Sequence, residues 1–208
     1  MSGRFRLKAR EWLDVPERKR TYNERHFAEA ASRYDVATRM MSFGQDAAWK
    51  RALVGALPGL PYPVCVDLAC GTGDVAFLLA GRYPGGVVKG VDISAPMLAI
   101  ARDRNSFPNV RFERGDMCDL PFPDGFADVV TGGYALRNAP DLREALAEVH
   151  RVLKPGGVAA FLDFSNPGRP LFRLLQYLLL RLVRSLGILP PRDAGGPRVR
   201  RGEPACVS

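Results

Sequence analysis

The stretch from Asp67 to Asp74 has the residue types of a small-molecule site. It reads Asp-Leu-Ala-Cys-Gly-Thr-Gly-Asp, and it lies between a Val-rich run and an apolar run with helical spacing. We therefore expect it to connect a strand to a helix. Gly71 and Gly73 allow the backbone to approach a ligand closely, and the start of the helix offers free N–H groups. The loop is a candidate binding site.

Two further carboxylates follow later strand-like runs. Asp92 comes nineteen residues after Gly73, and a carboxylate at that place can accept both hydroxyls of a ribose. Asp116 follows the third run, where it can meet the edge of an adenine. Because the carboxyl ends of parallel strands share one edge of an open α/β sheet, Asp67, Asp92 and Asp116 are predicted to gather there.

Two classes of cofactor compete for the glycine loop. Its start at Gly71 matches the G-x-G-x-x-A pattern of nicotinamide dehydrogenases, but one match of this kind is a weak signal. Asp74 would place a carboxylate beside a pyrophosphate, which is repulsive, whereas S-adenosyl-L-methionine carries a sulfonium and an ammonium group and no phosphate. The acids therefore favour S-adenosyl-L-methionine. The structural alternative is that Asp67 and Asp74 only cap a turn and a helix.

The elements around these residues alternate between strand-like and helix-like patterns. Strands are expected at 64–70, 87–94, 110–117, 127–135 and 158–165, and helices at 74–80, 96–104 and 142–153. Such alternation predicts βαβ units, and hence an α/β fold with a mostly parallel, Rossmann-like sheet. Residues 22–41 and 45–57 look helical, with a break at 42–44.

Composition and charge exclude several classes of protein. The 208 residues are 47% hydrophobic and 25% charged, as in ordinary globular proteins. The net charge of +8 is uneven, because residues 1–25 carry +4, residues 169–208 carry +6 and the centre carries −2. Nucleic-acid sites usually place basic residues in the folded domain, so we expect no nucleic-acid partner. The four cysteines form no CxxC pair and no cluster with histidine, so we expect neither a metal site nor a disulfide framework.

The basic ends fit an anionic membrane surface better than nucleic acid. No signal peptide and no run apolar enough to span a bilayer is visible, so we expect a cytoplasmic protein, at most peripheral to the membrane. Residues 171–189 read LFRLLQYLLLRLVRSLGIL, in which three arginines share one face of a helix and leave a broad Leu face. Packing against the sheet and contact with a membrane are both open for this segment.

Several stretches carry a resemblance to a known family. VDLACGTGD, GVDIS, LPFPDGFADVV and RVLKPGG are similar to class I S-adenosylmethionine-dependent methyltransferases. MMSFGQDAAWKR, YALRNAPD and LDFSNP narrow the resemblance to the ubiquinone/menaquinone biosynthesis C-methyltransferase family, over roughly residues 20–167. The resemblance implies methylation of a ring carbon of a prenylated quinol, with S-adenosyl-L-methionine as the cofactor.

The resemblance also implies site residues. Carried over by position, the family's cofactor contacts fall on Thr72, Asp92, Asp116, Met117 and Gly133. With the acid and the glycines of the loop, the expected cofactor site comprises Asp67, Gly71, Thr72, Gly73, Asp92, Asp116, Met117 and Gly133.

The expected catalytic residues are Arg137, Asn138 and Tyr134. Arg137 stays protonated, so it would hold a quinolate oxygen or orient a water that takes the proton. Asn138 would hydrogen-bond the other ring oxygen, and Tyr134 would stack on the ring. The structural alternative for Arg137 is an ion pair with Asp141, four residues later.

The C-terminal part departs from the family, whose members continue with an antiparallel strand pair. Here residues 190–208 are rich in Pro, Gly and Arg and lack a strand pattern. We therefore expect a sheet without that pair and with an open edge beside the fifth strand. The expected division is a helical lid and substrate region (1–59), a cofactor-binding core (60–166), a Leu/Arg-rich helix (167–189) and a disordered tail (190–208).

Some alternatives stay open. The chain could methylate another small molecule, or it could be an impaired cofactor-binding remnant. The choice between a benzoquinol and a naphthoquinol is open too, and a homo-oligomer is compatible with the sequence.

Overall fold

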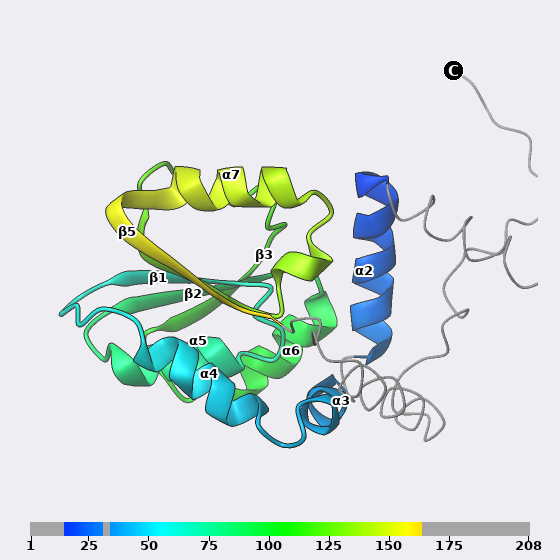
Figure 1. Cartoon of the computed structure of the whole chain (residues 1–208), viewed down its shortest axis with the longest axis horizontal. Coiled ribbons are helices and arrows are strands. Elements are labelled where there is room, and N and C mark those ends of the chain that lie inside the picture. Colours follow the sequence, from blue (N-terminus) through cyan, green and yellow to red (C-terminus); the bar gives the residue numbers. More distant parts are fainter. Residues whose placement is uncertain (1–14, 31–33, 164–208) are drawn as a thin grey trace, which may run out of the picture.

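A computed structural model describes residues 15–30 and 34–163 of the chain (Figure 1). Five strands form one sheet in the order β3-β2-β1-β4-β5, and every neighbouring pair is parallel. The strands are β1 (Val64–Leu68), β2 (Val87–Asp92), β3 (Val110–Arg114), β4 (Ala127–Gly133) and β5 (Leu153–Leu162). The predicted α/β fold with a parallel sheet is confirmed.

The helices after β1 fall close to their predicted places. The N-terminal helices are α2 (Pro16–Ala30), α3 (Tyr34–Met41) and α4 (Asp46–Gly55). Here α2 begins at Pro16, six residues before the predicted start, and α3 is a separate helix within the range predicted as one. The others are α5 (Asp74–Arg82), α6 (Ala95–Arg104), the short η2 (Leu136–Asn138) and α7 (Leu142–Val152). The predicted break at 42–44 is present, since Phe43 and Gly44 adopt φ values of 52° and 78° between α3 and α4.

All five strands end two or three residues before their predicted ends, and two boundaries have a clear local reason. β1 ends at Leu68, two residues early, because Ala69 turns the chain out of the sheet with a φ of 48°. β5 starts at Leu153, well before the expected residue 158, so Gly156 and Gly157 lie inside the strand. The register between β4 and β5 shifts between Ala127 and Val129.

Helices cover both faces of the sheet (Figure 1). On one face, side chains of α4, α5 and α6 pack on strand residues in a core that includes Leu79, Leu98 and Val129. On the other face, α7 and the loop before β4 bury Val66, Leu68, Val91, Leu120, Phe122, Val130, Val149 and Val152. Burial of apolar area on both faces is what holds a parallel sheet together.

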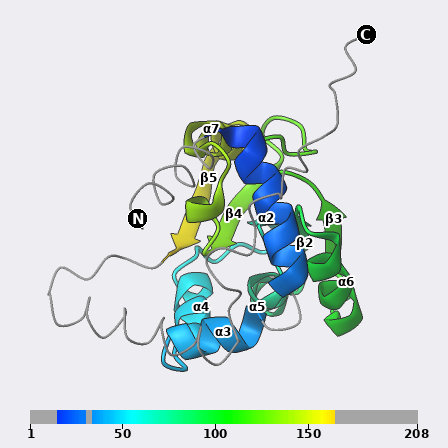
Figure 2. The same ribbon diagram turned by 90° about the vertical axis from the view of Figure 1, so that its right-hand side faces the viewer.

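α2 stands apart from these two layers. It crosses the end of the sheet at which the strands terminate, as Figure 2 shows. Arg20 and Asn23 of this helix contact residues that follow the strands, where the sequence places the candidate site.

Several expectations lie outside the described residues. These are the absent final strand pair, the Leu/Arg-rich helix at 167–189 and the tail at 190–208. Within the described part of the chain, every helix is too short or too polar to cross a bilayer.

Candidate active site

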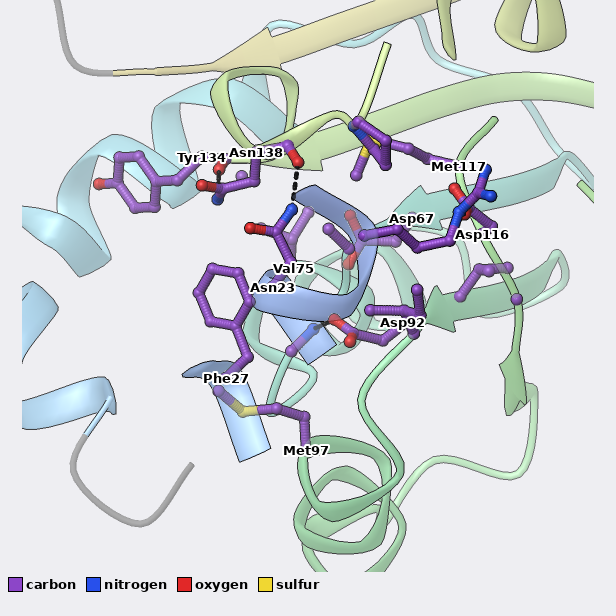
Figure 3. A pocket seen from close by; sticks show the side chains of 18 of the residues that line it. Asn23, Phe27, Asp67, Val75, Asp92, Met97, Asp116, Met117, Tyr134 and Asn138 are labelled. Carbon is purple, nitrogen blue, oxygen red and sulfur yellow. Dashed lines mark hydrogen bonds and ion pairs between the residues drawn. The ribbon is translucent and has the colours of Figure 1, made fainter. Parts of the chain in front are cut away.

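A cavity of about 870 Å³, its open mouth included, lies between α2 and the carboxyl ends of the strands (Figure 3). It holds most of the residues singled out from the sequence. Those that line it are Asp67, Gly71, Asp92, Asp116, Met117, Gly133, Tyr134 and Asn138. Thr72, Gly73 and Arg137 are not among its lining residues.

The glycine loop is shaped by backbone conformations that favour glycine. Gly71 and Gly73 have φ values of 54° and 93°. A Cβ on Gly73 would also lie 2.8 Å from the Phe77 ring and 3.0 Å from the Phe112 ring. The turn therefore needs glycine at position 73 for φ and for space, although the residue does not itself face the cavity.

Asp92 binds the glycine loop directly. Its two carboxylate oxygens accept hydrogen bonds of 2.8 Å from the N–H groups of Gly71 and Ser94. Burial raises the pKa of Asp92, while these N–H groups act in the opposite direction. The amide that would face a pyrophosphate is thus already bound to a carboxylate. This arrangement suits hydroxyl donors such as those of a ribose and disfavours a dinucleotide.

Asp67 is the most deeply buried acid of the site, at 1% exposed. Thr131 donates a 2.9 Å hydrogen bond to its Oδ1, but Oδ2 has no hydrogen-bond partner. Burial raises the pKa of Asp67 to about 7. A buried carboxylate oxygen without a partner is costly, and a ligand ammonium group would relieve that cost. The cavity therefore fits S-adenosyl-L-methionine.

Asp74 does not act as the sequence argument assumed. Its Oδ2 lies 2.9 Å from Lys50 Nζ, and its Oδ1 lies 2.7 Å from Arg104 Nη2. Burial opposes its charge, but the two cations outweigh burial and lower the pKa of Asp74. Its charge is compensated, so repulsion of a pyrophosphate by Asp74 is not what selects the cofactor. The cofactor is instead selected by Asp92, which already binds the Gly71 N–H, and by Asp67, whose Oδ2 has no hydrogen-bond partner.

Asp116 is engaged on both of its oxygens. Oδ2 is ion-paired with Arg20 of α2, and Oδ1 accepts a 2.9 Å hydrogen bond from Cys118 N–H. An adenine edge at this place must therefore share Asp116 with Arg20.

Two of the expected catalytic residues, Arg137 and Asn138, lie in η2, and Tyr134 lies just before it. Tyr134 is 2% exposed, and its hydroxyl donates a 2.8 Å hydrogen bond to Asp46 of α4. Figure 3 shows its ring directed away from Asp67 and Asp92. The amide nitrogen of Asn138 donates to the Tyr134 carbonyl at 2.9 Å. The Tyr134 ring is thus buried, and its contacts hold the loop between β4 and α7 in place.

Arg137 pairs with a residue that the sequence argument did not consider. Its guanidinium lies 3.6 Å from Asp163 Oδ1 and 5.2 Å from the centre of the Tyr134 ring. Asp141, the partner expected from helical spacing, instead caps α7 by accepting from Arg143 and Glu144 N–H groups. Arg137 would have to turn from Asp163 to reach a ligand in the cavity.

Among the lining residues that sequence reasoning missed, four come from the N-terminal helices. Arg20, Asn23 and Phe27 come from α2, and Lys50 comes from α4. The spacing of the first three, at i, i+3 and i+7, places them on one helix face, which is the one signal that could have found them. Asn23 donates a 2.6 Å hydrogen bond to the Asn138 carbonyl.

Comparison with known proteins identifies the family. A family model matches residues 16–187, most of the chain. The chain belongs to the ubiE/COQ5 methyltransferase family. It is 45% identical over 160 residues to demethylmenaquinone methyltransferase of Thermus thermophilus, covering 76% of this chain and 72% of that protein. It is 43% identical to 2-phytyl-1,4-naphtoquinone methyltransferase of Synechococcus elongatus, covering 74% and 68%.

Solved structures of methyltransferases share the fold. An S-adenosylmethionine-dependent methyltransferase from Mesorhizobium loti is 32% identical with a TM-score of 0.50, covering 55% of this chain and 52% of that one. Phosphoethanolamine N-methyltransferase 1 of Haemonchus contortus has a TM-score of 0.63 at 23% identity, covering 74% and 34%. The resemblance to this family expected from the sequence is confirmed, and the chain is an S-adenosylmethionine-dependent methyltransferase.

Proposed function

We propose that this methyltransferase transfers a methyl group to a ring carbon of a prenylated quinol. The observation that carries the proposal is its 45% and 43% identity to enzymes named for demethylmenaquinone and 2-phytyl-1,4-naphtoquinone. The family match over residues 16–187 includes all the lining residues of the cavity. Both named substrates are naphthoquinones, which favours a naphthoquinol over a benzoquinol.

The cofactor would lie along the carboxyl ends of the strands. Asp92 would accept the ribose hydroxyls, Asp116 with Met117 would contact the adenine, and Asp67 would face the ammonium group. Thr72 and Gly133 are proposed contacts as well. Bound S-adenosyl-L-methionine supplies an electrophilic methyl group at its sulfonium.

The chain must make the ring carbon electron-rich and hold it in line with that methyl group. A ring carbon beside a quinol hydroxyl becomes nucleophilic when the hydroxyl loses its proton. We propose that Arg137, released from Asp163, holds the resulting quinolate oxygen or orients the water that takes the proton. Asn138 lines the cavity, and its amide would hydrogen-bond the other ring oxygen. Tyr134, which the sequence suggested as a stacking surface, would instead support this loop.

The test is transfer of a labelled methyl group to reduced, prenylated acceptors that lack it. We expect a demethylnaphthoquinol to be methylated faster than a matched benzoquinol with the same prenyl chain. Faster methylation of the benzoquinol would reverse the preference. Binding of the cofactor without transfer to either acceptor would contradict the proposed function, and would favour another small-molecule acceptor or an impaired enzyme.

The acceptor dissolves in membranes, so we propose that the enzyme works at a membrane surface, as a protein peripheral to it on the cytoplasmic side. Residues 171–189 are the segment proposed to touch the lipid, because their sequence would give a helix one Leu face and one Arg face. Flotation with liposomes should then depend on anionic lipid. Equal flotation with neutral lipid, or none, would contradict this role. We also propose that the chain associates into a homo-oligomer, which light scattering would test.

A further inference from the structure

The strand order places the site acids in a row. β3, β2, β1 and β4 are neighbours in that order. Asp116 follows β3, Asp92 ends β2, and Asp67 lies near the end of β1 beside Thr131 of β4. If adenine meets Asp116 and ribose meets Asp92, the amino-acid end of the cofactor extends over β1 and β4. That end carries an ammonium group and a carboxylate.

The ammonium group has a partner in Asp67, but the carboxylate needs a cation. Among the described residues, two cationic side chains line the cavity, Arg20 and Lys50. Arg20 is ion-paired with Asp116, at the adenine end of the row. Lys50 lies at the opposite end, where its Nζ is 6.0 Å from the centre of the Tyr134 ring.

Lys50 is held in place by two carboxylates. Its Nζ lies 2.7 Å from Asp46 Oδ2 and 2.9 Å from Asp74 Oδ2, and its side chain is 11% exposed. An ammonium group has three N–H donors, so these two partners leave one donor for a ligand. Burial disfavours the charged form of Lys50, but Asp46 and Asp74 outweigh burial and raise its pKa. Lys50 therefore remains charged in a site that is largely shielded from water.

Lys50 is also close enough to Asp67 to favour the charged form of that acid. The two side chains line the same cavity from α4 and β1. Opposite charges in one cavity match a group that carries a cation and an anion on one carbon, as an amino acid does. Asp46 and Asp74 both bind the Lys50 ammonium group from behind, and Arg104 shares the charge of Asp74.

We propose that Lys50 binds the α-carboxylate of S-adenosyl-L-methionine, opposite Asp67, which binds the ammonium group. Lys50 thus selects for the complete amino-acid end of the cofactor. The proposal rests on the identity of the cofactor and is independent of the methyl acceptor.

The experiment compares two ligands by calorimetry. One is S-adenosylhomocysteine, and the other is its decarboxylated analogue, 5′-deoxy-5′-(3-aminopropylthio)adenosine. The parent chain should bind S-adenosylhomocysteine about 10- to 100-fold more tightly, the range expected for a charge-assisted hydrogen bond. Lys50→Met should reduce this preference to about twofold or less while leaving affinity for the decarboxylated ligand nearly unchanged. Lys50→Arg should retain most of the preference.

Two variants serve as matched controls. Arg104→Gln removes the other cation on Asp74, which does not line the cavity, and it should keep the full preference. Arg20→Gln removes the other cation of the lining and should keep it too. Loss of the preference in Arg20→Gln with retention in Lys50→Met would overturn the proposal.

A purely structural role for Lys50 gives a different result. In that case Lys50→Met would weaken both ligands by the same factor and the preference would survive. Lys50→Met leaves two carboxylates without the cation between them, and this variant could fail to fold. The double variant Asp46→Asn/Lys50→Met is therefore also compared with Asp46→Asn. This second comparison keeps the test valid if the single variant does not fold. Equal affinity of the parent for the two ligands would overturn the proposal. Failure of the parent to bind either ligand would instead contradict the cofactor assignment.

Discussion

The Arg20 guanidinium of α2 is ion-paired with the Asp116 carboxylate, although 96 residues separate them in the sequence. On the opposite side of the cavity, Asn23 of the same helix donates to the Asn138 carbonyl at 2.6 Å. α2 is thereby attached to the loop after β3 and to the loop after β4. The helix lies over the site, and its Arg20 is paired with the Asp116 carboxylate, at which an adenine amino group is expected.

Replacement of Arg20 should therefore change cofactor binding. In the parent, Asp116 must give up its ion pair with Arg20 before it can bind the adenine. Arg20→Gln removes this cost, so we expect affinity for S-adenosyl-L-methionine to rise about two- to tenfold. The ion pair is partly exposed, which limits its strength. Calorimetry at low and high salt should show that the parent gains affinity as salt screens the ion pair and that the variant does not.

The control for this effect is Arg18→Gln on the exposed side of the same helix, for which we expect unchanged affinity. A fall in affinity in Arg20→Gln would show that Arg20 contacts the cofactor itself.

The raised pKa of Asp67 makes stability depend on pH. Its pKa is raised by burial from 3.8 to about 7 in the folded chain. The folded state thus holds this proton more tightly than the unfolded state, so the contribution is fully present below pH 4 and is lost as pH rises through 7. We expect the difference in melting temperature between the parent and Asp67→Asn to shift against the parent from pH 5.5 to pH 8.

Cofactor affinity should have the opposite pH dependence, because an ammonium group binds the ionised Asp67. Calorimetry should show weaker binding of S-adenosylhomocysteine below pH 7 in the parent. A flat pH profile for both stability and affinity, equal to that of Asp67→Asn, would mean that Asp67 does not titrate in this range.

Removal of the Tyr134 hydroxyl should lower stability. The hydroxyl is buried and donates to Asp46 at 2.8 Å, so Tyr134→Phe leaves Asp46 with one hydrogen bond fewer. We expect a loss of about 1–3 kcal/mol in the free energy of unfolding, measured as a lower urea midpoint at unchanged slope. Tyr62→Phe is the matched control, because Tyr62 is 78% exposed, and its midpoint should not move. Unchanged stability in both variants would argue against the buried hydrogen bond.

Replacement of Arg137 should separate catalysis from cofactor binding. Arg137 does not line the cavity in this state, so Arg137→Ala should leave affinity for the cofactor within about twofold. Removal of one donor to a developing oxyanion typically costs about 100- to 1000-fold in turnover, and we expect a loss of that size in labelled methyl transfer. Arg143→Ala, exposed on α7, should keep full turnover. Turnover of Arg137→Ala within a few-fold of the parent would refute the catalytic role.

Local pattern was enough for the fold and for part of the site. The periodicity that marks a single strand or helix is visible in a short window of sequence. The order of these elements along the chain alternates between strand and helix, which predicts a parallel sheet. Since parallel strands end at one edge, the positions of Asp67, Asp92 and Asp116 at the ends of strand-like runs predicted their meeting in one cavity. The motifs around Arg137 and Ser42 were specific enough to indicate the family, which the comparisons confirm.

The tertiary structure decided which charges are available to a ligand. Asp74 looked like a ligand-facing acid, but folding places Lys50 and Arg104 against it. Arg137 was matched with its neighbour in sequence, whereas its ion-pair partner is Asp163. The reason is physical: secondary structure depends on local periodicity, while an ion pair depends on how helices and loops pack across long separations. The sequence by itself determined the order of strands and helices and the cofactor class, and only the packing of α2 and α4 brought Arg20 and Lys50 to the cavity.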